Sequence, residues 1–279
     1  MATRINESLI KYLAGLLDAD GSLSFSFRRV RDQHIEDRYF IGLMLRLASS
    51  DAIDKDGFIR SLPTLCEMGT VCNRSESSAC FDWSVANRSD LEMLLPRLVK
   101  HMVIKARHWQ WMLDTWRMAR ANNKTCSPEE RDRLTLAAKE SRRRNVGPLK
   151  PKNHPTWAWL AGYLDGDGYY SYRHRVQNGY ENWNIYVSAC AHVNDIVVLE
   201  FLQRAFGGAI VPQGQSDNVK LWKRQLGYSN RSFALPFLAK LSRHSRLKRQ
   251  KIDAMIRHHR QRLSVPGPKR VSDSLSAQG

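Results

Sequence analysis

The chain has 279 residues, of which 42% are hydrophobic and eight are tryptophan, so it can bury one large core or two smaller ones, and wholesale disorder is excluded. Its formal net charge is +17, a surplus that repels itself unless a polyanion offsets it, so a nucleic acid is the expected partner. The five cysteines are odd in number and contain no C-x-x-C pair, which argues against a zinc site or a disulfide framework. Charge alone leaves open a ribosome-like basic protein or a membrane-surface binder.

The first half of the chain predicts a helix, two strands, a helix, two strands and a closing helix. Asn6 is a helix-start residue, and the apolar run after it predicts a first helix that ends near Asp20. Strand-like stretches follow, and a basic stretch predicts the last helix. The expected strands are 22–29, 39–48, 70–74 and 80–86; the middle helix ends at Gly69, and the closing helix spans 90–120.

A polar connector spans residues 121–155. Ser127 is a good capping residue, Pro128 suits the first helical position, and Glu129 and Glu130 place acid in the first turn. The sequence therefore predicts a linker helix near 128–144, followed by an extended segment from Gly147 to Pro155.

The second half repeats the plan of the first. Its expected strands are 169–175, 183–191, 209–213 and 219–228; its middle helix ends at Gly207-Gly208, and its closing basic helix spans 232–262. The order is αββαββα twice, which predicts an α+β fold with two pseudo-symmetric repeats and antiparallel sheets. The expected domains are an N-terminal repeat at 1–120, the linker at 121–155, a C-terminal repeat at 156–264 and a flexible tail at 265–279.

Two matching motifs begin the repeats. Residues 12–21 read Tyr-Leu-Ala-Gly-Leu-Leu-Asp-Ala-Asp-Gly, and residues 159–168 read Trp-Leu-Ala-Gly-Tyr-Leu-Asp-Gly-Asp-Gly. The small Ala-Gly pairs let two helix backbones approach closely, which would bring their carboxylate-bearing C-terminal ends together. Such ends already hold partial negative charge, so a hard divalent cation such as Mg²⁺ is needed to stabilise them. Clustered carboxylates, a hard cation and a basic surface together indicate phosphodiester hydrolysis.

The first motif, Leu13 to Gly21, resembles the LAGLIDADG motif with one conservative difference. The second, Leu160 to Gly168, departs from it at Tyr163, Leu164 and Gly166. The chain is therefore similar to single-chain LAGLIDADG homing endonucleases over roughly residues 5–262. This resemblance implies that the motif helices pack at the repeat interface.

The resemblance also implies site residues. Asp20 and Asp167 would be catalytic and bind the metals, together with the adjacent positions Ala19 and Gly166. Asp18 and Asp165 match the family's helix-capping position and rank second. Lys105 and Lys248 match the basic residue of the closing helices that positions water or neutralises charge. Further family positions fall near Ser49-Ser50 and Ala191-His192, which lack the glutamine of some relatives, so no role is assigned there.

The implied function is site-specific cleavage of both strands of double-stranded DNA, with Mg²⁺ as cofactor and Mn²⁺ or Ca²⁺ able to substitute for binding. Strands of about ten residues span roughly 33 Å, or about ten base steps, so two sheets would read about twenty base pairs. The two halves differ in sequence, so the DNA site should be asymmetric. The resemblance also implies that cleavage leaves short 3′ overhangs, that the enzyme acts as a monomer and that an intron encodes it.

No signal peptide or membrane-spanning apolar segment is evident in the sequence. We therefore expect an intracellular, soluble protein without a membrane partner, in a bacterial cytoplasm or in an organelle or nucleus of the host.

Polar residues that follow each motif are the candidate DNA contacts, because alternate strand residues share one face that can enter the major groove. They are Arg28, Arg29, Arg31, His34, Arg38, Arg46, Tyr170, Tyr172, Arg173, Arg175, Gln177, Asn178, Asn184, Gln213, Gln215, Lys220, Lys223, Arg224 and Gln225. The basic run 243–262 predicts phosphate contact or a solvated helix face.

Alternatives remain for each feature. Asp-x-Asp-Gly also opens an EF-hand loop, although neither copy has the later ligands. Asp20 and Asp167 could be ordinary acids at helix ends, and Lys105 and Lys248 could be solvated surface residues. The strands that follow the motifs could form an ordinary polar sheet face. For the whole chain, an RNA maturase acting on intron RNA is the first alternative, and a DNA-binding regulator is the second. Retention of both Asp20 and Asp167 favours cleavage.

Overall fold

The computed structural model describes residues 5–30, 37–74, 79–121, 125–147, 155–177, 180–192, 196–213, 216–227 and 231–264. The side chains at 174–177, 180–182, 192, 213, 216–218, 222, 225–227, 231–232 and 263 lie outside this description. The chain forms two compact units, Met1–Gly166 and Asp167–Gly279. Among the described helices, none combines the length and apolar character needed to cross a membrane.

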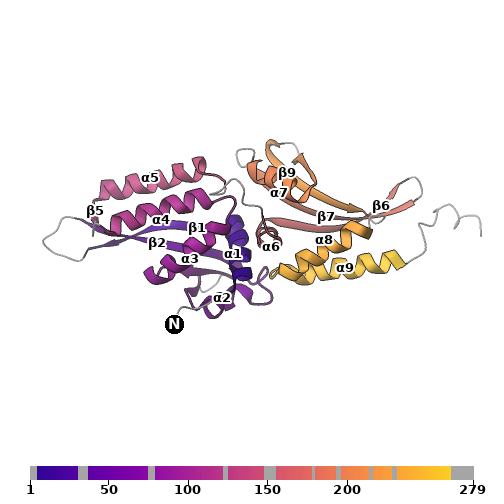
Figure 1. Cartoon of the computed structure of the whole chain (residues 1–279), viewed down its shortest axis with the longest axis horizontal. Coiled ribbons are helices and arrows are strands. Elements are labelled where there is room, and N and C mark those ends of the chain that lie inside the picture. Colours follow the sequence, from indigo (N-terminus) through magenta and orange to yellow (C-terminus); the bar gives the residue numbers. More distant parts are fainter. Residues whose placement is uncertain are drawn as a thin grey trace, which may run out of the picture. The chain divides into compact units, whose positions relative to one another are not determined.

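The first unit contains the first repeat, the linker helix and the second motif helix (Figure 1). Its elements are α1 (Glu7–Asp20), β1 (Gly21–Arg29), β2 (Tyr39–Ser50), α2 (Phe58–Cys66), β3 (Thr70–Asn73), β4 (Cys80–Val85), α3 (Arg88–His101), α4 (Ala106–Ala121), β5 (Thr125–Cys126), α5 (Pro128–Arg144) and α6 (Trp157–Gly166).

The second unit contains the remainder of the second repeat. Its elements are β6 (Gly168–Gln177), β7 (Tyr180–His192), α7 (Ile196–Phe206), β8 (Ala209–Gln213), β9 (Ser216–Gly227), α8 (Arg231–His244) and α9 (Arg249–Ser264). Helix order and strand order match those of the first repeat, so the predicted α+β fold with two repeats is confirmed.

The two sheets have the same antiparallel topology. Their strand orders are β1-β2-β4-β3, with β5 pairing to β2, and β6-β7-β9-β8. One side of each sheet is apolar and covered by helices; in the first sheet it carries Leu23, Leu45 and Trp83, which are 7%, 0% and 0% exposed. Side chains alternate along a strand, so the intervening residues form the opposite side. We call this opposite side the outward face of each sheet.

Each closing helix is two helices, so the predicted continuous helices 90–120 and 232–262 were wrong. In the first repeat α3 ends at His101 and α4 begins at Ala106; in the second α8 ends at His244 and α9 begins at Arg249. The break after α3 exposes the backbone N–H groups of the next turn, and a distant carboxylate binds them, as described below. No local sequence pattern predicts that a carboxylate so far away in the chain binds this turn. The short strand β5 was also missed.

The linker helix α5 spans Pro128–Arg144, as predicted. Ser127 Oγ accepts from the Glu130 N–H at 3.2 Å, and Glu130 returns a bond to the Ser127 N–H at 3.0 Å, forming a capping box. This start is local in sequence, which is why it could be predicted. The predicted tail beyond Pro266 and most of the extended segment before Pro155 lie outside the described residues.

Candidate functional site

The two motif helices, α1 and α6, pack backbone against backbone within the first unit. A Cβ atom on Gly15 would lie 1.9 Å from the carbonyl oxygen of Trp159, and one on Gly162 would lie 2.0 Å from that of Tyr12. Real Cβ atoms do not approach so closely, so glycine is required at both positions. The predicted close approach of the two motif helices through small residues is confirmed.

Two hydrogen bonds cross between the same helices. The Tyr12 hydroxyl donates to Asp165 Oδ2 at 2.8 Å, and the Trp159 indole N–H donates to Asp18 Oδ2 at 2.9 Å. Tyr12 and Trp159 hold equivalent positions in the two motifs, as do Asp18 and Asp165. All four side chains are at least 97% buried. Each motif therefore binds the first aspartate of the other through its own aromatic residue.

Asp18 caps α4. Its carboxylate accepts the backbone N–H groups of Val103, Ile104 and Lys105 at 2.7, 3.2 and 2.8 Å. Burial raises the pKa of Asp18, while these donors and the Trp159 indole oppose that rise by stabilising the charged form. The capping position that the resemblance implied for Asp18 agrees with this geometry, and Asp18 is too enclosed to reach a ligand.

Lys105 binds the C-terminal end of α1. Its ammonium donates to the carbonyl oxygens of Leu17, Ala19 and Gly21 at 3.0, 3.0 and 2.8 Å. Helix C-termini carry partial negative charge, so a fixed cation here offsets the electrostatic cost of placing acids at the same end. In the second unit the Lys248 ammonium donates to the Gly168 carbonyl oxygen at 2.6 Å, the counterpart of the Gly21 contact.

The second acid of each motif differs from the first by its exposure. Asp20 ends α1 and is exposed, and Asp167 directly follows α6 and is also exposed. A Cβ atom on Gly166 would lie 2.7 Å from Asp20 Oδ2 and 2.5 Å from the Ala19 Cβ, so the end of α6 lies against the acidic end of α1. Exposed carboxylates are oxygen donors, the ligand type that a hard divalent cation prefers.

Within the described residues, no three His, Cys, Asp or Glu side chains gather into a metal-binding group. Cys190 lies near Asp167; burial first, and that carboxylate second, raise the pKa of its thiol.

The outward face of the first sheet is polar. Strand register puts Arg28 opposite Phe40 and Arg46 opposite Ser22, and both arginines are exposed there. Ser24 and Ser26 lie on the same face and were missed by the sequence analysis, although the period of two would have found them. Arg38 is exposed and follows the outward register. Arg29 has the opposite register and forms an ion pair with Asp37.

The outward face of the second sheet centres on Tyr186. The Arg173 guanidinium lies 5.0 Å and the Lys223 ammonium 4.6 Å from the centre of its ring. Asn184 shares this register but is only 4% exposed, which limits its reach. Tyr169, 55% exposed, and Ser171 also follow the outward register and were missed.

Four predicted DNA contacts, Tyr170, Tyr172, Arg224 and Lys220, were wrong, because alternation along a strand defines two faces but not which of them the helices cover. Tyr170 is 1% exposed on the helix-covered side. The Tyr172 ring lies 4.3 Å from the ring of His258 on α9. The Arg224 guanidinium lies near the rings of Phe233 and Phe237 on α8, at 5.8 and 5.9 Å.

Lys220 has the same register as Arg224 and so also belongs to the helix-covered side. Arg31, His34, Asn178 and Gln215 lie outside the described residues, as do the side chains of Arg175, Gln177, Gln213 and Gln225. Their predicted contacts remain predictions.

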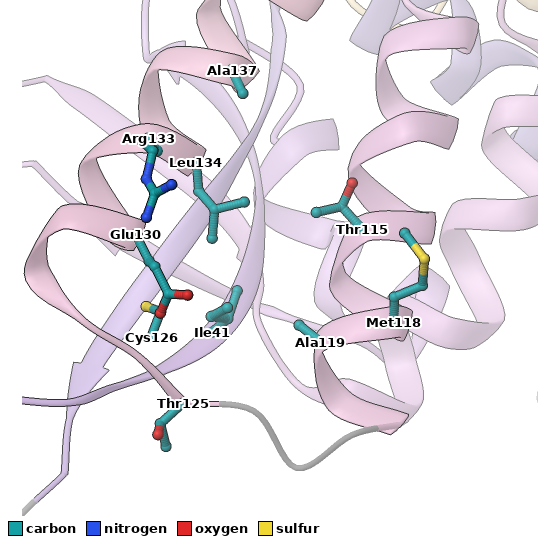
Figure 2. A pocket seen from close by; sticks show the side chains of 10 residues that line it. All are labelled: Ile41, Thr115, Met118, Ala119, Thr125, Cys126, Glu130, Arg133, Leu134 and Ala137. Atoms are coloured by element: carbon teal, nitrogen blue, oxygen red, sulfur yellow. The ribbon is translucent and has the colours of Figure 1, made fainter.

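A cavity of about 520 Å³ lies between α4, α5 and the β2–β5 edge. Figure 2 shows Leu134 and Ala137 of α5 across from Thr115, Met118 and Ala119 of α4. The remaining lining residues are Ile41, Thr125, Cys126, Glu130 and Arg133. Ile41 is on the helix-covered side of the sheet, so this cavity is separate from the outward face; no motif in the sequence predicts it.

No protein-family model and no curated protein sequence matches the chain. Solved structures do match. I-SmaMI, a LAGLIDADG homing endonuclease bound to cleaved DNA, is 16% identical, with 91% of each chain covered and a TM-score of 0.66. I-GzeII, in complex with its DNA target, is 13% identical, with 99% of this chain and 93% of that chain covered and a TM-score of 0.67. I-AabMI, bound to uncleaved DNA, is 14% identical, with 91% and 92% covered and a TM-score of 0.65. The chain therefore has the LAGLIDADG homing endonuclease fold.

Proposed function

We propose that the chain is a divalent-metal-dependent DNA endonuclease that cuts both strands of one long, asymmetric site. The observation that carries the proposal is the contrast within each motif: Asp18 and Asp165 are buried at a helix contact, whereas Asp20 and Asp167 are exposed. An exposed acid at a helix C-terminus adds to the partial negative charge already there, and a bound cation would offset that repulsion. The fold shared with DNA-bound nucleases supports this interpretation.

Asp20 and Asp167 would hold Mg²⁺, with the main chain at Ala19 and Gly166 beside them. Mn²⁺ or Ca²⁺ would substitute for binding; the fold neighbour I-SmaMI was solved bound to uncleaved target in the presence of calcium ions. When bound, such a cation polarises the scissile phosphate and stabilises the leaving oxygen.

The protein's own groups hold this site in place. Asp18 binds the turn before α4, and the ammonium of Lys105 then binds the last carbonyls of α1. The three carbonyl contacts support a charge-neutralising and positioning role for Lys105 rather than direct proton transfer. Lys248 would act in the same way through Gly168 in the second unit.

The outward faces would contact the DNA. Arg28, Arg46, Arg173 and Lys223 supply donors for phosphates and guanine edges, while Ser24, Ser26 and Tyr169 extend the polar surface. The two sheets carry different residues, so the site would be asymmetric, and one chain with both motifs would act as a monomer. A site of about twenty base pairs and short 3′ overhangs remain part of this proposal.

A maturase acting on intron RNA is the second candidate, favoured by the basic composition alone. A DNA-binding regulator is the third. Neither activity requires Asp20 or Asp167, so these two residues discriminate between the functions.

In vitro selection of cleaved sites from a randomised duplex library with Mg²⁺ tests the proposal. The native chain should recover one long asymmetric site, and Asp20→Asn and Asp167→Asn should recover none while still binding it. Asp114→Asn, on the exposed side of α4, is the matched control and should cut like the native chain. Cleavage that persists in both motif variants, or absent cleavage with tight RNA binding, would overturn the proposal.

A further inference from the structure

The helices α8 and α9 carry a strong positive charge on the side of the second unit that its outward face does not use. Residues 231–264 contain ten lysines and arginines and one acid, Asp253. The two helices pack against each other (Figure 1), and α9 covers the apolar side of the sheet through Tyr172 and His258.

Several of these cations point away from the sheet. On α9, Ile252, Met255, Ile256 and His259 are buried, whereas Arg257 and Arg260 are exposed. On α8, Leu238 and Leu241 are buried, whereas Lys240 and Arg243 are exposed; Arg246, in the connecting turn, is exposed as well. We call Lys240, Arg243, Arg246, Arg257 and Arg260 the rear basic surface.

DNA on the outward face cannot neutralise this charge. Packed layers are about 10 Å apart and a helix adds a radius of about 5 Å, so the two surfaces are separated by roughly 15 Å of protein. The Debye length at physiological salt is about 8 Å, so phosphates on the outward face are screened from the rear basic surface.

The fold does not require such a surface. The equivalent residues of the first repeat, 88–121, contain seven lysines and arginines and three acids. Two of those arginines form ion pairs there: Arg88 with Glu92 at 2.9 Å, and Arg97 with Glu7 at 3.1 Å. In residues 231–264 of the second repeat the single acid is Asp253. Its carboxylate lies 3.8 Å from Arg249 and accepts a hydrogen bond from the Ser242 hydroxyl, so both of these contacts are within the α8–α9 pair.

The chemistry of the surface fits the phosphates of duplex nucleic acid. On α9 the large apolar residues are buried, so it lacks the exposed apolar face of a helix that inserts into a membrane interface. Among the described residues of α9, no exposed aromatic ring is available to stack an unpaired base, which single-stranded RNA recognition uses. On α8 the ring of Phe233 is exposed, but it lies near the Arg224 guanidinium, on the side that faces the sheet. Exposed cations about one helical turn apart suit a sequence-independent contact with a phosphate backbone.

We propose that the rear basic surface binds a second DNA duplex without sequence preference, so that one monomer can bridge two DNA segments. The inference rests on the proposed function, which assigns the outward faces to the cleavage site. A bridging monomer would stay associated with neighbouring DNA while its outward faces engage a site.

A two-duplex capture experiment tests the inference. The native chain is bound at equimolar ratio to an immobilised duplex containing its selected site, in EDTA. A dye-labelled 30-base-pair duplex of unrelated sequence is then titrated in, and sedimentation confirms that the protein is monomeric. The second duplex should bind with a dissociation constant between about 10⁻⁶ and 10⁻⁴ M at physiological salt, the usual range for non-specific contacts.

The test variant is Lys240→Glu/Arg257→Glu/Arg260→Glu. It should lose second-duplex capture at least tenfold and still hold the immobilised site. Arg117→Glu/Lys139→Glu/Arg143→Glu is the matched control, with the same change in net charge at exposed positions of α4 and α5. It should capture the second duplex almost normally. The neutral set Lys240→Gln/Arg257→Gln/Arg260→Gln replaces the test variant if that variant fails to fold, and should lower the log–log salt slope of capture by up to about 2.7.

Capture of no second duplex by the native chain, or equal loss in both charge-reversed variants, would overturn the inference. So would an RNA hairpin or an anionic phosphatidylserine vesicle that displaces the second duplex at a tenfold lower phosphate concentration. Cleavage is measured separately with Mg²⁺, so failure of the proposed nuclease function is read independently of failure to bridge.

Discussion

Tyr12 of the first motif helix donates a 2.8 Å hydrogen bond to the buried carboxylate of Asp165, on the second motif helix. The equivalent residue Trp159 makes the reciprocal contact to Asp18. The two pairs tie the helices together at fixed heights along their axes. They thereby fix the ends of α1 and α6, where the exposed acids Asp20 and Asp167 follow in the sequence.

Removing one of these donors should destabilise the fold. Tyr12→Phe leaves a buried carboxylate without one of its hydrogen bonds, which costs about 1–3 kcal/mol. We expect the urea midpoint of unfolding to fall accordingly. Tyr169→Phe removes a hydroxyl from a residue that is 55% exposed and should leave the midpoint unchanged. Equal midpoints for both variants would show that the crossed bond contributes nothing.

Gly15→Ala should be among the most damaging single-methyl additions to this chain. The new Cβ would lie 1.9 Å from a backbone oxygen of α6, so the helices must separate along their contact. We expect a loss of about 3 kcal/mol or more, at the upper end for overpacking. Gly57→Ala is the control: nothing lies within 4 Å of its Cβ, and only its positive φ of 67° is strained, at about 1 kcal/mol. If thermal unfolding ranks Gly57→Ala as the more damaging change, the close-packing argument fails.

Asp18→Asn and Asp20→Asn should separate stability from activity. Asp18 accepts three backbone N–H groups and an indole N–H, and its amide replacement should lower stability by at least about 2 kcal/mol, because charge-assisted bonds contribute about 1.5–3 kcal/mol each. Asp20 is exposed, so its replacement should leave unfolding unchanged and abolish Mg²⁺-dependent cleavage. Paired denaturation and single-turnover assays measure both. An unstable Asp20→Asn or a stable Asp18→Asn would reverse the assignment.

Lys105→Met should impair cleavage more than DNA binding. It removes the cation that satisfies three carbonyl oxygens at the end of α1. We expect at least a 100-fold lower single-turnover rate, with Ca²⁺-supported DNA binding within about threefold of native. Lys105→Arg should not rescue the rate, because a planar guanidinium cannot converge on three carbonyls as an ammonium does. Full activity in the arginine variant would argue against this geometry.

Stability should fall with acidification partly through His108. Burial first, then the charges of Arg142 and Lys105, lower its pKa to about 4, from 6.5 in the unfolded chain. Between these two pKa values the His108 imidazole is protonated in the unfolded chain but neutral in the folded chain. The free energy of unfolding therefore decreases as the pH falls from about 6.5 toward 4. His108→Gln should show a shallower loss of urea midpoint between pH 7 and pH 5. A slope identical to that of the native chain would show that His108 does not contribute.

The sequence by itself determined the elements whose signals are local. The repeat of the motif, the paired sheets and the linker helix with its Ser127–Glu130 capping box all rest on residues a few positions apart. The candidate metal acids could likewise be identified from the motif, because Asp20 and Asp167 stand at fixed positions within it.

Tertiary structure decided what depends on distant partners. The break between α3 and α4 is stabilised by Asp18, 85 residues before Val103, and Lys105 reaches back to the same helix end. The phase of the strands was likewise decided by packing, since a period of two defines two faces but not which of them the helices cover. Tyr170 and Arg224 therefore turned toward helices, and Arg173 and Lys223 outward, because burial of the apolar side selects one phase for the whole strand.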